Sequence, residues 1–531
     1  MAQQNPPGGF GSNDPGVSQP GAAGGPAPSA APGPGGPVSP GDNEVQFGPT
    51  ATRAAPKRAL LLGGLLAVVV LVGAGGTFAY TVLASTGAQP AEVVPSTAIG
   101  YVRVDLDPSA GQKIAATRFL GKLPKVKTQG ADVDVKQTLW SWIAGSDPKL
   151  KKLAYDTDVK PWLGDRAAVA LMPGVTAKKP DLVFALQVTD EGKAKEGIAK
   201  IATTSGADGV DVTARDGFAL ITPKGSSALA DLDKGSLATN TGFIADMKAM
   251  GDQGIASMWF DGKALGDLAA KVGGPVVDPN QLGGLGRVSM ALRFDADFVE
   301  LAGITRGATT KPDTAPPTGG AASLPEDTMV ALQSNGLGDA VAKGWPQLEK
   351  SIGSSLGADS ISGIEKQLGV KLPDDLQVLL GKSLTLSLPD QDLSNVSKAQ
   401  DPPRLGAKIV TTNGARADEV VQSLVEKAGV DNFVKRKIDG DKVFLATTDD
   451  YLAALQRDGK LGQTDAFRKA VRDGDTATKA IFVNLDRLEP TYVRSVPADY
   501  QEFTKALRAV GMSASQNADG EGTFSLRLVG N

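Results

Sequence analysis

A set of landmarks that occurs twice in the same order is the feature that most constrains the fold of this chain. The second copy of each landmark follows the first by about 217 to 230 residues. Because chance similarity would not preserve both order and spacing, the sequence predicts two tandem homologous modules. The paired landmarks are residues 94–99 and 324–330, 162–173 and 380–389, 237–243 and 461–467, and 259–261 and 484–486.

The predicted modules are residues 93–307 and 324–531, joined by a linker, 308–323, that is rich in Pro, Gly and Thr. Each module interleaves apolar runs of strand length with helical patterns, and Asp-Gly pairs at Asp216 and Asp439 favour tight hairpins. We therefore expect an α+β fold in which each module is a mostly antiparallel sheet of about eight strands with helices packed on one face. The clearest patterns are the strands 182–188 and 443–447 and the helices 194–202 and 417–428.

The N-terminal part of the chain has a composition of its own. Nearly half of residues 1–57 are Gly or Pro, and aliphatic clusters are almost absent. Such a composition does not bury enough apolar surface to offset the entropy lost on ordering. This stretch is therefore predicted to be a disordered tail.

Residues 58–84 are predicted to form one transmembrane helix. After the first of them no charge occurs until Glu92, and the stretch 59–84 would be roughly 39 Å long as a helix, more than the ~30 Å hydrocarbon core of a bilayer. A cleavable signal peptide would begin nearer the N-terminus and be shorter, so an uncleaved anchor is the better interpretation. Three basic residues within 53–58 precede the span and the next is Arg103, which predicts a cytoplasmic N-terminus and an extracytoplasmic C-terminal region.

The 531 residues include neither histidine nor cysteine. Without them the chain cannot build a Ser-His-Asp triad, an imidazole general base, a cysteine nucleophile, a disulfide or the common zinc sites. Its 55 basic residues are balanced by 59 acidic ones, so it lacks the basic footprint of a nucleic-acid-binding protein. The chemistry that remains would use carboxylates, lysine, tyrosine or hydroxyls.

Three motifs together resemble an uncharacterised family of bacterial membrane proteins, found mainly in actinobacteria and defined only as a domain of unknown function, number 3352. They are an opening strand that begins with Val-Pro or Leu-Pro, the segment Asp-Val-Lys-Pro-Trp-Leu-Gly at 158–164, and a Leu-x-x-Thr-x-x-Phe segment. The resemblance covers nearly everything after residue 90 and the anchor before it. It implies a membrane-anchored domain and supplies no catalytic residue, substrate or cofactor.

Three short motifs allow a chemical interpretation, and each has a simpler one. Residues 353–357 fit the G-x-S-x-G pattern of nucleophile elbows, but they follow a helical pattern and no histidine is present to activate the serine. Ser146 and Lys149 have S-x-x-K spacing without the companion K-T-G, and an N-cap explains the serine better. The stretch 390–401 faintly resembles a calcium loop, yet Asn395 replaces the usual glycine, so a polar loop is the better account.

Acidic stretches and tryptophans are the remaining candidate site residues in the sequence. The acidic stretches 131–134 and 156–158 are more typical of helix caps and turns than of paired catalytic carboxylates. Tryptophans can line a surface for sugars or peptides, but so few in two modules favour core packing. We therefore assign no catalytic, cofactor-binding or metal-binding residue. The five tryptophans are Trp140, Trp142, Trp162, Trp259 and Trp345.

The sequence favours a non-enzymatic, single-pass membrane-anchored protein that binds or scaffolds at the cell envelope, through an inter-module cleft or two equivalent surfaces. Its expected partners are the lipid bilayer, through the transmembrane helix, and an envelope protein, lipid or glycan; neither nucleic acid nor a cofactor is expected. Two alternatives stay open. A solute- or lipid-binding module would be marked by a continuous apolar cavity between sheet and helices, and a carboxylate-based envelope hydrolase by clustered acids with shifted pKa values in a deep pocket.

Overall fold

The computed structural model describes residues 88–124, 134–176, 179–207, 209–272, 279–309, 320–357, 359–393 and 402–531. The predicted tail, the predicted membrane span and most of the predicted linker lie outside these ranges. Within them, no helix combines the length and the apolar character that crossing a bilayer requires.

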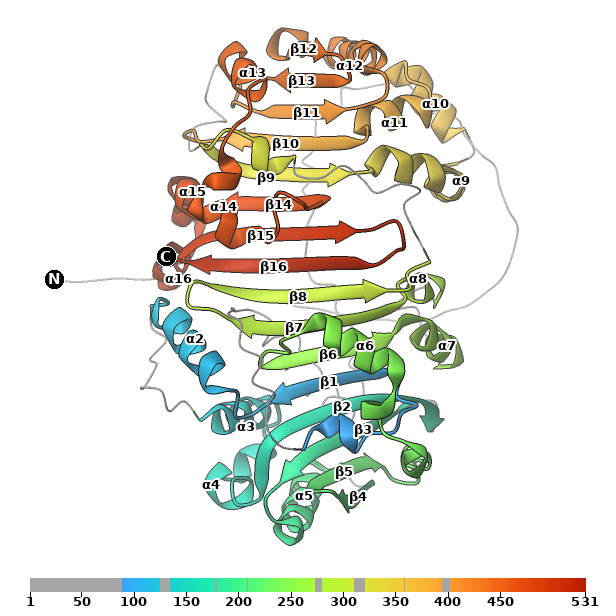
Figure 1. Cartoon of the computed structure of the whole chain (residues 1–531), viewed down its shortest axis with the longest axis vertical. Coiled ribbons are helices and arrows are strands. Elements are labelled where there is room, and N and C mark those ends of the chain that lie inside the picture. Colours follow the sequence, from blue (N-terminus) through green and yellow to red (C-terminus); the bar gives the residue numbers. More distant parts are fainter. Residues whose placement is uncertain are drawn as a thin grey trace, which may run out of the picture. The chain divides into compact units, whose positions relative to one another are not determined.

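The strands of the described ranges form one sheet of sixteen, and every pair of neighbours is antiparallel (Figure 1). This confirms the α+β class and the antiparallel pairing. The first eight strands are β1 (Gly100–Asp105), β2 (Leu163–Thr176), β3 (Lys179–Val188), β4 (Val210–Arg215), β5 (Phe218–Pro223), β6 (Ala256–Asp261), β7 (Arg287–Phe294) and β8 (Phe298–Arg306). The last eight are β9 (Thr328–Asn335), β10 (Ser383–Pro389), β11 (Gly406–Val410), β12 (Lys435–Asp439), β13 (Lys442–Ala446), β14 (Lys479–Asn484), β15 (Leu507–Gln516) and β16 (Gly522–Gly530).

The two halves of the sheet repeat one strand order. The first half runs β4-β5-β3-β2-β1-β6-β7-β8, and the second runs β12-β13-β11-β10-β9-β14-β15-β16. They meet where β8 pairs with β16, from Thr305 opposite Gly522 to Phe298 opposite Val529. The expectation of one sheet per module is therefore wrong: β8 and β16 would each be an exposed edge in a separate sheet, and pairing them removes both edges.

Helices connect the strands of both halves. In the first half they are α2 (Ala110–Gly121), α3 (Val135–Ser146), α4 (Tyr155–Asp158), α5 (Glu191–Ser205), α6 (Thr241–Met250), α7 (Gly262–Val272) and α8 (Pro279–Gly284). In the second they are α9 (Leu337–Leu356), α10 (Ser360–Leu368), α11 (Asp374–Leu380), α12 (Gly414–Ala428), α13 (Asp449–Leu455), α14 (Asp465–Ala470), α15 (Leu485–Tyr492) and α16 (Ala498–Lys505). The short 3-10 helices are η1 (Pro90–Glu92), η2 (Leu150–Lys152), η3 (Leu232–Lys234), η4 (Leu237–Thr239), η5 (Ala321–Ser323), η7 (Asp431–Phe433), η8 (Leu461–Gln463) and η9 (Val493–Ser495).

The repeated segments 237–243 and 461–467 form the same local structure. Each is a 3-10 helix followed by a capped α-helix, η4 with α6 and η8 with α14. The Asn240 side chain accepts a hydrogen bond from the backbone N of Phe243 at 3.0 Å, and the Thr464 hydroxyl accepts one from the N of Phe467 at 3.4 Å. In both segments the first Leu and the last Phe are buried in the core. The repeated sequence therefore specifies a helix N-cap that lies between two buried side chains.

Helices cover both faces of the sheet, so the expectation of helices on one face is wrong. On one face, α6, α13 and α14 pack over side chains such as Phe218, Trp259 and Phe482. On the other face, α2, α3, α5 and α12 pack over alternate side chains such as Ala219 and Val443. The reason is visible in the outer strands, where β5 and β13 are continuous apolar runs; such runs indicate strands that are buried on both faces.

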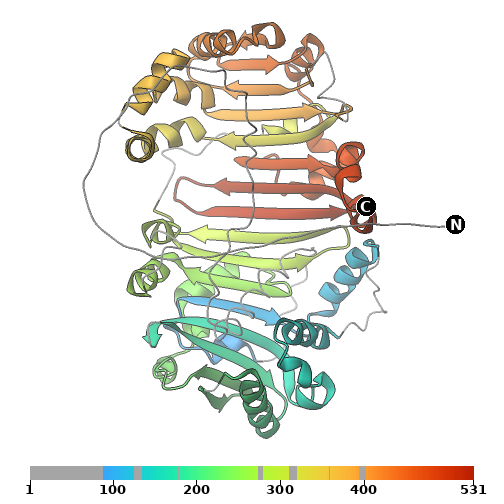
Figure 2. The ribbon, with the colours of Figure 1, turned by 180° about the vertical axis from the view of Figure 1, so that it is seen from behind.

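The centre of the second half leaves an apolar row exposed on the face opposite α14. Directly paired residues of five neighbouring strands, β10, β9, β14, β15 and β16, share this face. Their side chains are between 37% and 42% exposed. Seen from behind, no described helix lies in front of the middle of β14, β15 and β16 (Figure 2). The row consists of Leu386, Leu332, Ile481, Met512 and Leu526.

Candidate functional site

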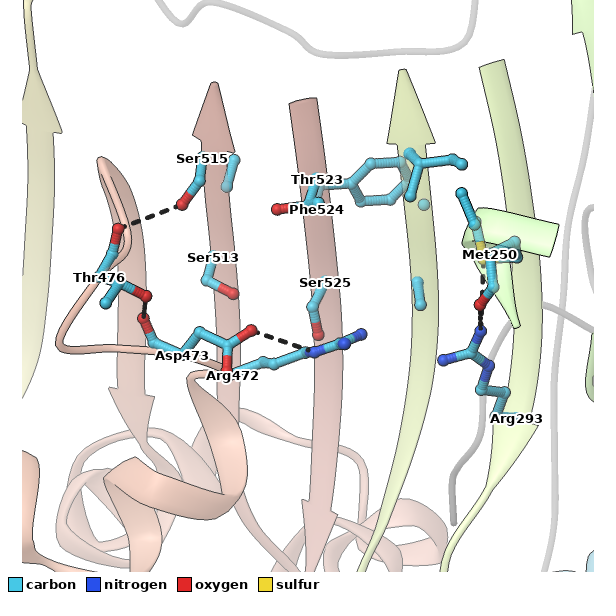
Figure 3. Close-up of a pocket in the computed structure, with 15 residues that line it drawn as sticks. Met250, Arg293, Arg472, Asp473, Thr476, Ser513, Ser515, Thr523, Phe524 and Ser525 are labelled. Carbon is cyan, nitrogen blue, oxygen red and sulfur yellow. Dashed lines mark hydrogen bonds and ion pairs between the residues drawn. The ribbon is translucent and has the colours of Figure 1, made fainter. Parts of the chain in front are cut away.

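A pocket of about 310 Å³ lies where the two halves of the sheet meet, on the face that carries α6 and α14. The C-terminal end of α6 bounds it on the side of the first half, and the loop between α14 and β14 bounds it on the side of the second half (Figure 3). Its polar lining comes mostly from the second half: Arg472, Asp473, Thr476, Ser513, Ser515, Thr523 and Ser525, with Arg293 and Met250 from the first. We call it the junction pocket.

Cross-strand register sets the polarity of the pocket floor. Ser513 on β15 pairs with Ser525 on β16, and Ser515 pairs with Thr523 in the next row on the same face. Ser525 in turn lies opposite Ala302 on β8. Four hydroxyl-bearing residues therefore lie side by side, next to small residues that leave space above the strands.

Beneath the pocket, one carboxylate is surrounded by three arginines. Glu300 of β8 is only 4% exposed in its side chain and lies opposite both Arg293 and Arg527 in the sheet. Its carboxylate accepts hydrogen bonds from the Ser525 hydroxyl at 2.7 Å and from Arg527 Nε at 3.0 Å. Nη1 of Arg293 and Nη1 of Arg472 each lie 3.7 Å from its oxygens. Glu300 thus links strands of both halves.

These neighbours keep the carboxylate charged. Burial alone would raise the pKa of Glu300, but the positive charges of Arg527, Arg472 and Arg293, together with the hydrogen bond from Ser525, outweigh it and hold the pKa below its ordinary value. Burial also lowers the pKa of Arg293 and of Arg527, against the opposing effect of Glu300. An ionised, fully bonded carboxylate serves as a counter-ion and does not have the raised pKa of a general acid.

Arg472 is the arginine with the most access to the pocket. Its side chain is 42% exposed, against 14% for Arg293. Arg293 is also held by the chain around it, since its Nε and Nη2 donate to the carbonyls of Asp252 and Met250 at 2.8 and 2.7 Å. Arg472 Nε lies 3.3 Å from the exposed carboxylate of Asp473. Figure 3 shows Arg472 extending over β16 toward Ser525.

The loop that carries Arg472 has a defined shape. Asp473 adopts a φ of +50°, a left-handed conformation that Asp tolerates better than most residues. Its carbonyl accepts the backbone N–H groups of Thr476 and Ala477, each at 2.9 Å. The Ser515 hydroxyl then donates to the Thr476 carbonyl at 3.3 Å. Two chain segments thereby fix the wall of the pocket opposite α6.

The serine motifs singled out in the sequence do not form nucleophilic sites. Ser355 lies in the last turn of α9 rather than in a strand-to-helix turn. Ser146 ends α3 and donates to the Trp142 carbonyl at 3.0 Å, so the N-cap interpretation of this residue is wrong. Lys149 Nζ donates to the Ser205 carbonyl at 3.0 Å. The S-x-x-K spacing alone does not show whether its serine begins or ends a helix.

The other candidate site residues that the structure describes have structural roles. Asp134 caps α3 by accepting from the N of Gln137 at 3.0 Å, and Asp158 accepts from the N of Ala154 at 2.8 Å and from Lys200 at 2.7 Å. Most of the calcium-like stretch lies outside the described residues. Among the described residues no group of three His, Cys, Asp or Glu could hold a metal ion. Four tryptophans are buried, and Trp142 is 39% exposed.

One part of the chain matches a known protein family. Residues 64–244 match the model of a family described as "Protein of unknown function (DUF3352)". The match supports the resemblance seen in the sequence over that stretch. It ends within α6, before Met250, so no residue of the junction pocket falls inside it.

The remaining comparisons are less informative. None of the curated proteins matches the chain. Among solved structures, crystal form I of TP0453 aligns at 8% sequence identity with a TM-score of 0.22, covering 70% of this chain and 97% of that one. Crystal form III of TP0453 aligns at 11% identity and a TM-score of 0.22, covering 43% and 83%. These values do not establish a common fold.

Proposed function

We propose that this protein is a membrane-anchored binding module of the cell envelope that takes a small anionic ligand in the junction pocket. The observation that carries the proposal is Arg472, a partly exposed guanidinium beside a floor of hydroxyls in a pocket shared by both halves. At about 310 Å³ the pocket has the size of a small ligand site, near the lower end of the usual range of ~300–1,000 Å³.

Arginine and hydroxyl groups favour a phosphate or carboxylate group on the ligand. A guanidinium donates two parallel hydrogen bonds to such a group, and serine and threonine hydroxyls add neutral donors beside it. Ser513, Ser515 and Thr523 lie on the floor within the same pocket as Arg472. The polar lining does not favour the lipid-binding alternative, which calls for a continuous apolar cavity.

Binding is better supported than catalysis. Glu300 is held ionised by three arginines, and Asp473 is an exposed neighbour of Arg472. Glu300 is therefore not a carboxyl whose pKa is raised toward neutrality, as a general acid in a glycosidase requires. The carboxylate-hydrolase alternative therefore finds no support in this pocket.

The same proposal covers the parts of the chain outside the described residues. We infer that residues 58–84 anchor the protein, that the tail 1–57 is cytoplasmic and that the sheet is extracytoplasmic. The repeated strand order and the paired landmarks support a duplication of one ancestral half.

Substitution of Arg472 by alanine tests the binding site. Titration of the full-length protein in detergent with inorganic phosphate and with citrate, followed by isothermal calorimetry, should show saturable binding of at least one probe. Arg472→Ala should weaken that binding about tenfold or more, which corresponds to ~1.4 kcal/mol, because a charge-assisted hydrogen-bond donor is lost. The fold should persist because this side chain is partly exposed.

Arg457→Ala is the matched control. Arg457 is an exposed arginine that follows α13, outside the pocket. Its loss should leave the affinity for the probe unchanged. Equal affinities of wild type and Arg472→Ala, or no saturable binding of either probe, would overturn the proposed ligand class.

A further inference from the structure

The first described residues of the chain, Ala88 and Gln89, are held by hydrogen bonds at the edge of the sheet that the ends of its strands form. The carbonyl of Ala88 accepts a hydrogen bond from Arg166 Nη1 at 2.7 Å, and Gln89 accepts one from Arg103 at 3.4 Å. Arg166 lies opposite Asp105 at the end of β1. The predicted span ends at residue 84, so only residues 85–87 separate it from Ala88, and residue 84 can lie at most about 14 Å from Ala88. This edge of the sheet therefore lies at the bilayer surface if the anchor is in place.

Three helices meet at the same edge. α2 follows the end of β1, α3 lies between α2 and the start of β2, and α16 leads into the start of β15. Phe119 of α2 packs in one cluster with Ala506 and Leu507, which follow α16, and α3 packs in one cluster with Leu163 at the start of β2. Figures 1 and 2 both show these three helices on one side, at the ends of the strands. We call this the α2–α3–α16 edge.

The α2–α3–α16 edge exposes large apolar side chains that the fold leaves uncovered. Ile114 of α2 is 52% exposed, Trp142 of α3 is 39% exposed, and Tyr500 and Phe503 of α16 are 63% and 37% exposed. Of the four aromatic residues among the exposed large hydrophobics of the described ranges, three lie here. The fourth, Phe433 of η7, lies between α12 and β12 at the far end of the second half.

Basic residues accompany these apolar side chains. Arg118 is one helical turn after Ile114 on the exposed side of α2, and Lys505 follows Phe503 on α16. Tryptophan and tyrosine prefer the membrane–water interface, and lysine and arginine extend their charged ends from it toward water. A surface that mixes both, at the strand ends where the described chain begins just after the predicted span, has the chemistry of an interfacial contact.

We propose that the α2–α3–α16 edge rests on the bilayer, with Trp142, Tyr500 and Phe503 inserted at the interface between lipid headgroups and acyl chains. The inference deepens the proposed function, because it rests on the anchor and fixes how the sheet stands on the membrane. The strands would then run away from the bilayer, and the junction pocket, which lies on one face of the sheet, would open to the side rather than toward the lipid.

Tryptophan quenching by brominated lipids tests this contact. The full-length protein is placed in nanodiscs of phosphatidylcholine and phosphatidylglycerol, with and without bromine on the acyl chains near the headgroup. The predicted span contains no tryptophan, and the other four tryptophans are buried. Bromolipid should therefore quench Trp142, and the quenched component should disappear in Trp142→Phe.

Two reporter variants in the Trp142→Phe background localise the contact. Phe503→Trp should restore quenching, whereas Phe433→Trp, an aromatic position that is at least as exposed but far from the edge, should not. Quenching that is unchanged by Trp142→Phe, or that appears at position 433 and not at 503, would overturn the edge contact while leaving the anchor intact. Failure of the chain to incorporate into nanodiscs would instead overturn the anchor, and the edge contact with it. Phosphate and citrate binding is measured independently of both.

Discussion

Asp295 shows how one buried carboxyl makes stability depend on pH. It lies in the turn between β7 and β8, is 7% exposed and accepts a hydrogen bond from the backbone N of Asp297. Burial, together with the charge of Asp297, raises its pKa to about 6, although Lys122 and Arg527 oppose the shift. Because the folded protein keeps this proton where the unfolded chain has lost it, the contribution of Asp295 to stability falls as pH rises from about 4 to about 6 and is constant above.

Asp295→Asn should remove this dependence. Between pH 4 and pH 7, the free energy of unfolding of the variant should rise by roughly 1–2 kcal/mol relative to that of the wild type, after allowance for solvent screening. Urea denaturation at both pH values measures the difference. The control is Asp519→Asn, because Asp519 is an exposed residue in the corresponding turn of the second half. This substitution should leave the free energy of unfolding unchanged at both pH values. A wild-type-to-variant gap that is the same at both pH values would contradict the role of Asp295.

At the scale of the element, two consecutive residues of β14 lie on opposite faces of the sheet, one buried and the other exposed. Phe482 is completely buried and meets Phe467 edge to face, with ring centroids 5.2 Å apart. Ile481 next to it is 39% exposed in the apolar row. Phe482→Ala should therefore cost about 3–5 kcal/mol of unfolding free energy, because it leaves a cavity. Ile481→Ala should cost about 1 kcal/mol or less.

Urea denaturation of the full-length protein compares the two variants. Each serves as the other's control, because they differ by one position along the same strand. A large loss for Ile481→Ala would mean that part of the chain outside the described residues covers the apolar row. Similar small losses for both would contradict the packing of α14 on the sheet.

At the scale of the whole sheet, the pairing of β8 with β16 makes one unit of the two halves. The ladder is continuous from Phe298 to Thr305, and Glu300 bonds to Ser525 and Arg527 across it. Hydrogen exchange followed by mass spectrometry should find the amides of β8 and β16 as protected as those of the β1–β2 and β9–β10 pairs, because all lie inside the sheet. Faster exchange at β8 and β16 alone would show that the halves separate.

The sequence by itself determined the local elements and their repetition. The strands around 182–188 and 443–447, the helices around 194–202 and 417–428, and the two Asp-Gly hairpins all occur where they were predicted. These features depend on turn chemistry and on apolar periodicity, which act over a few residues. The span at 58–84 stays a prediction, since it lies outside the described residues.

Only the tertiary structure decided how the halves join and where a site lies. Glu300 and Arg527 are 227 residues apart in the chain, and no local pattern marks them as partners. Their pairing follows from the register of β8 against β16, because a strand presents the same alternation to any partner and the choice depends on which edges remain open. The junction pocket exists because that choice brings β8 of the first half beside β16, within reach of Arg472.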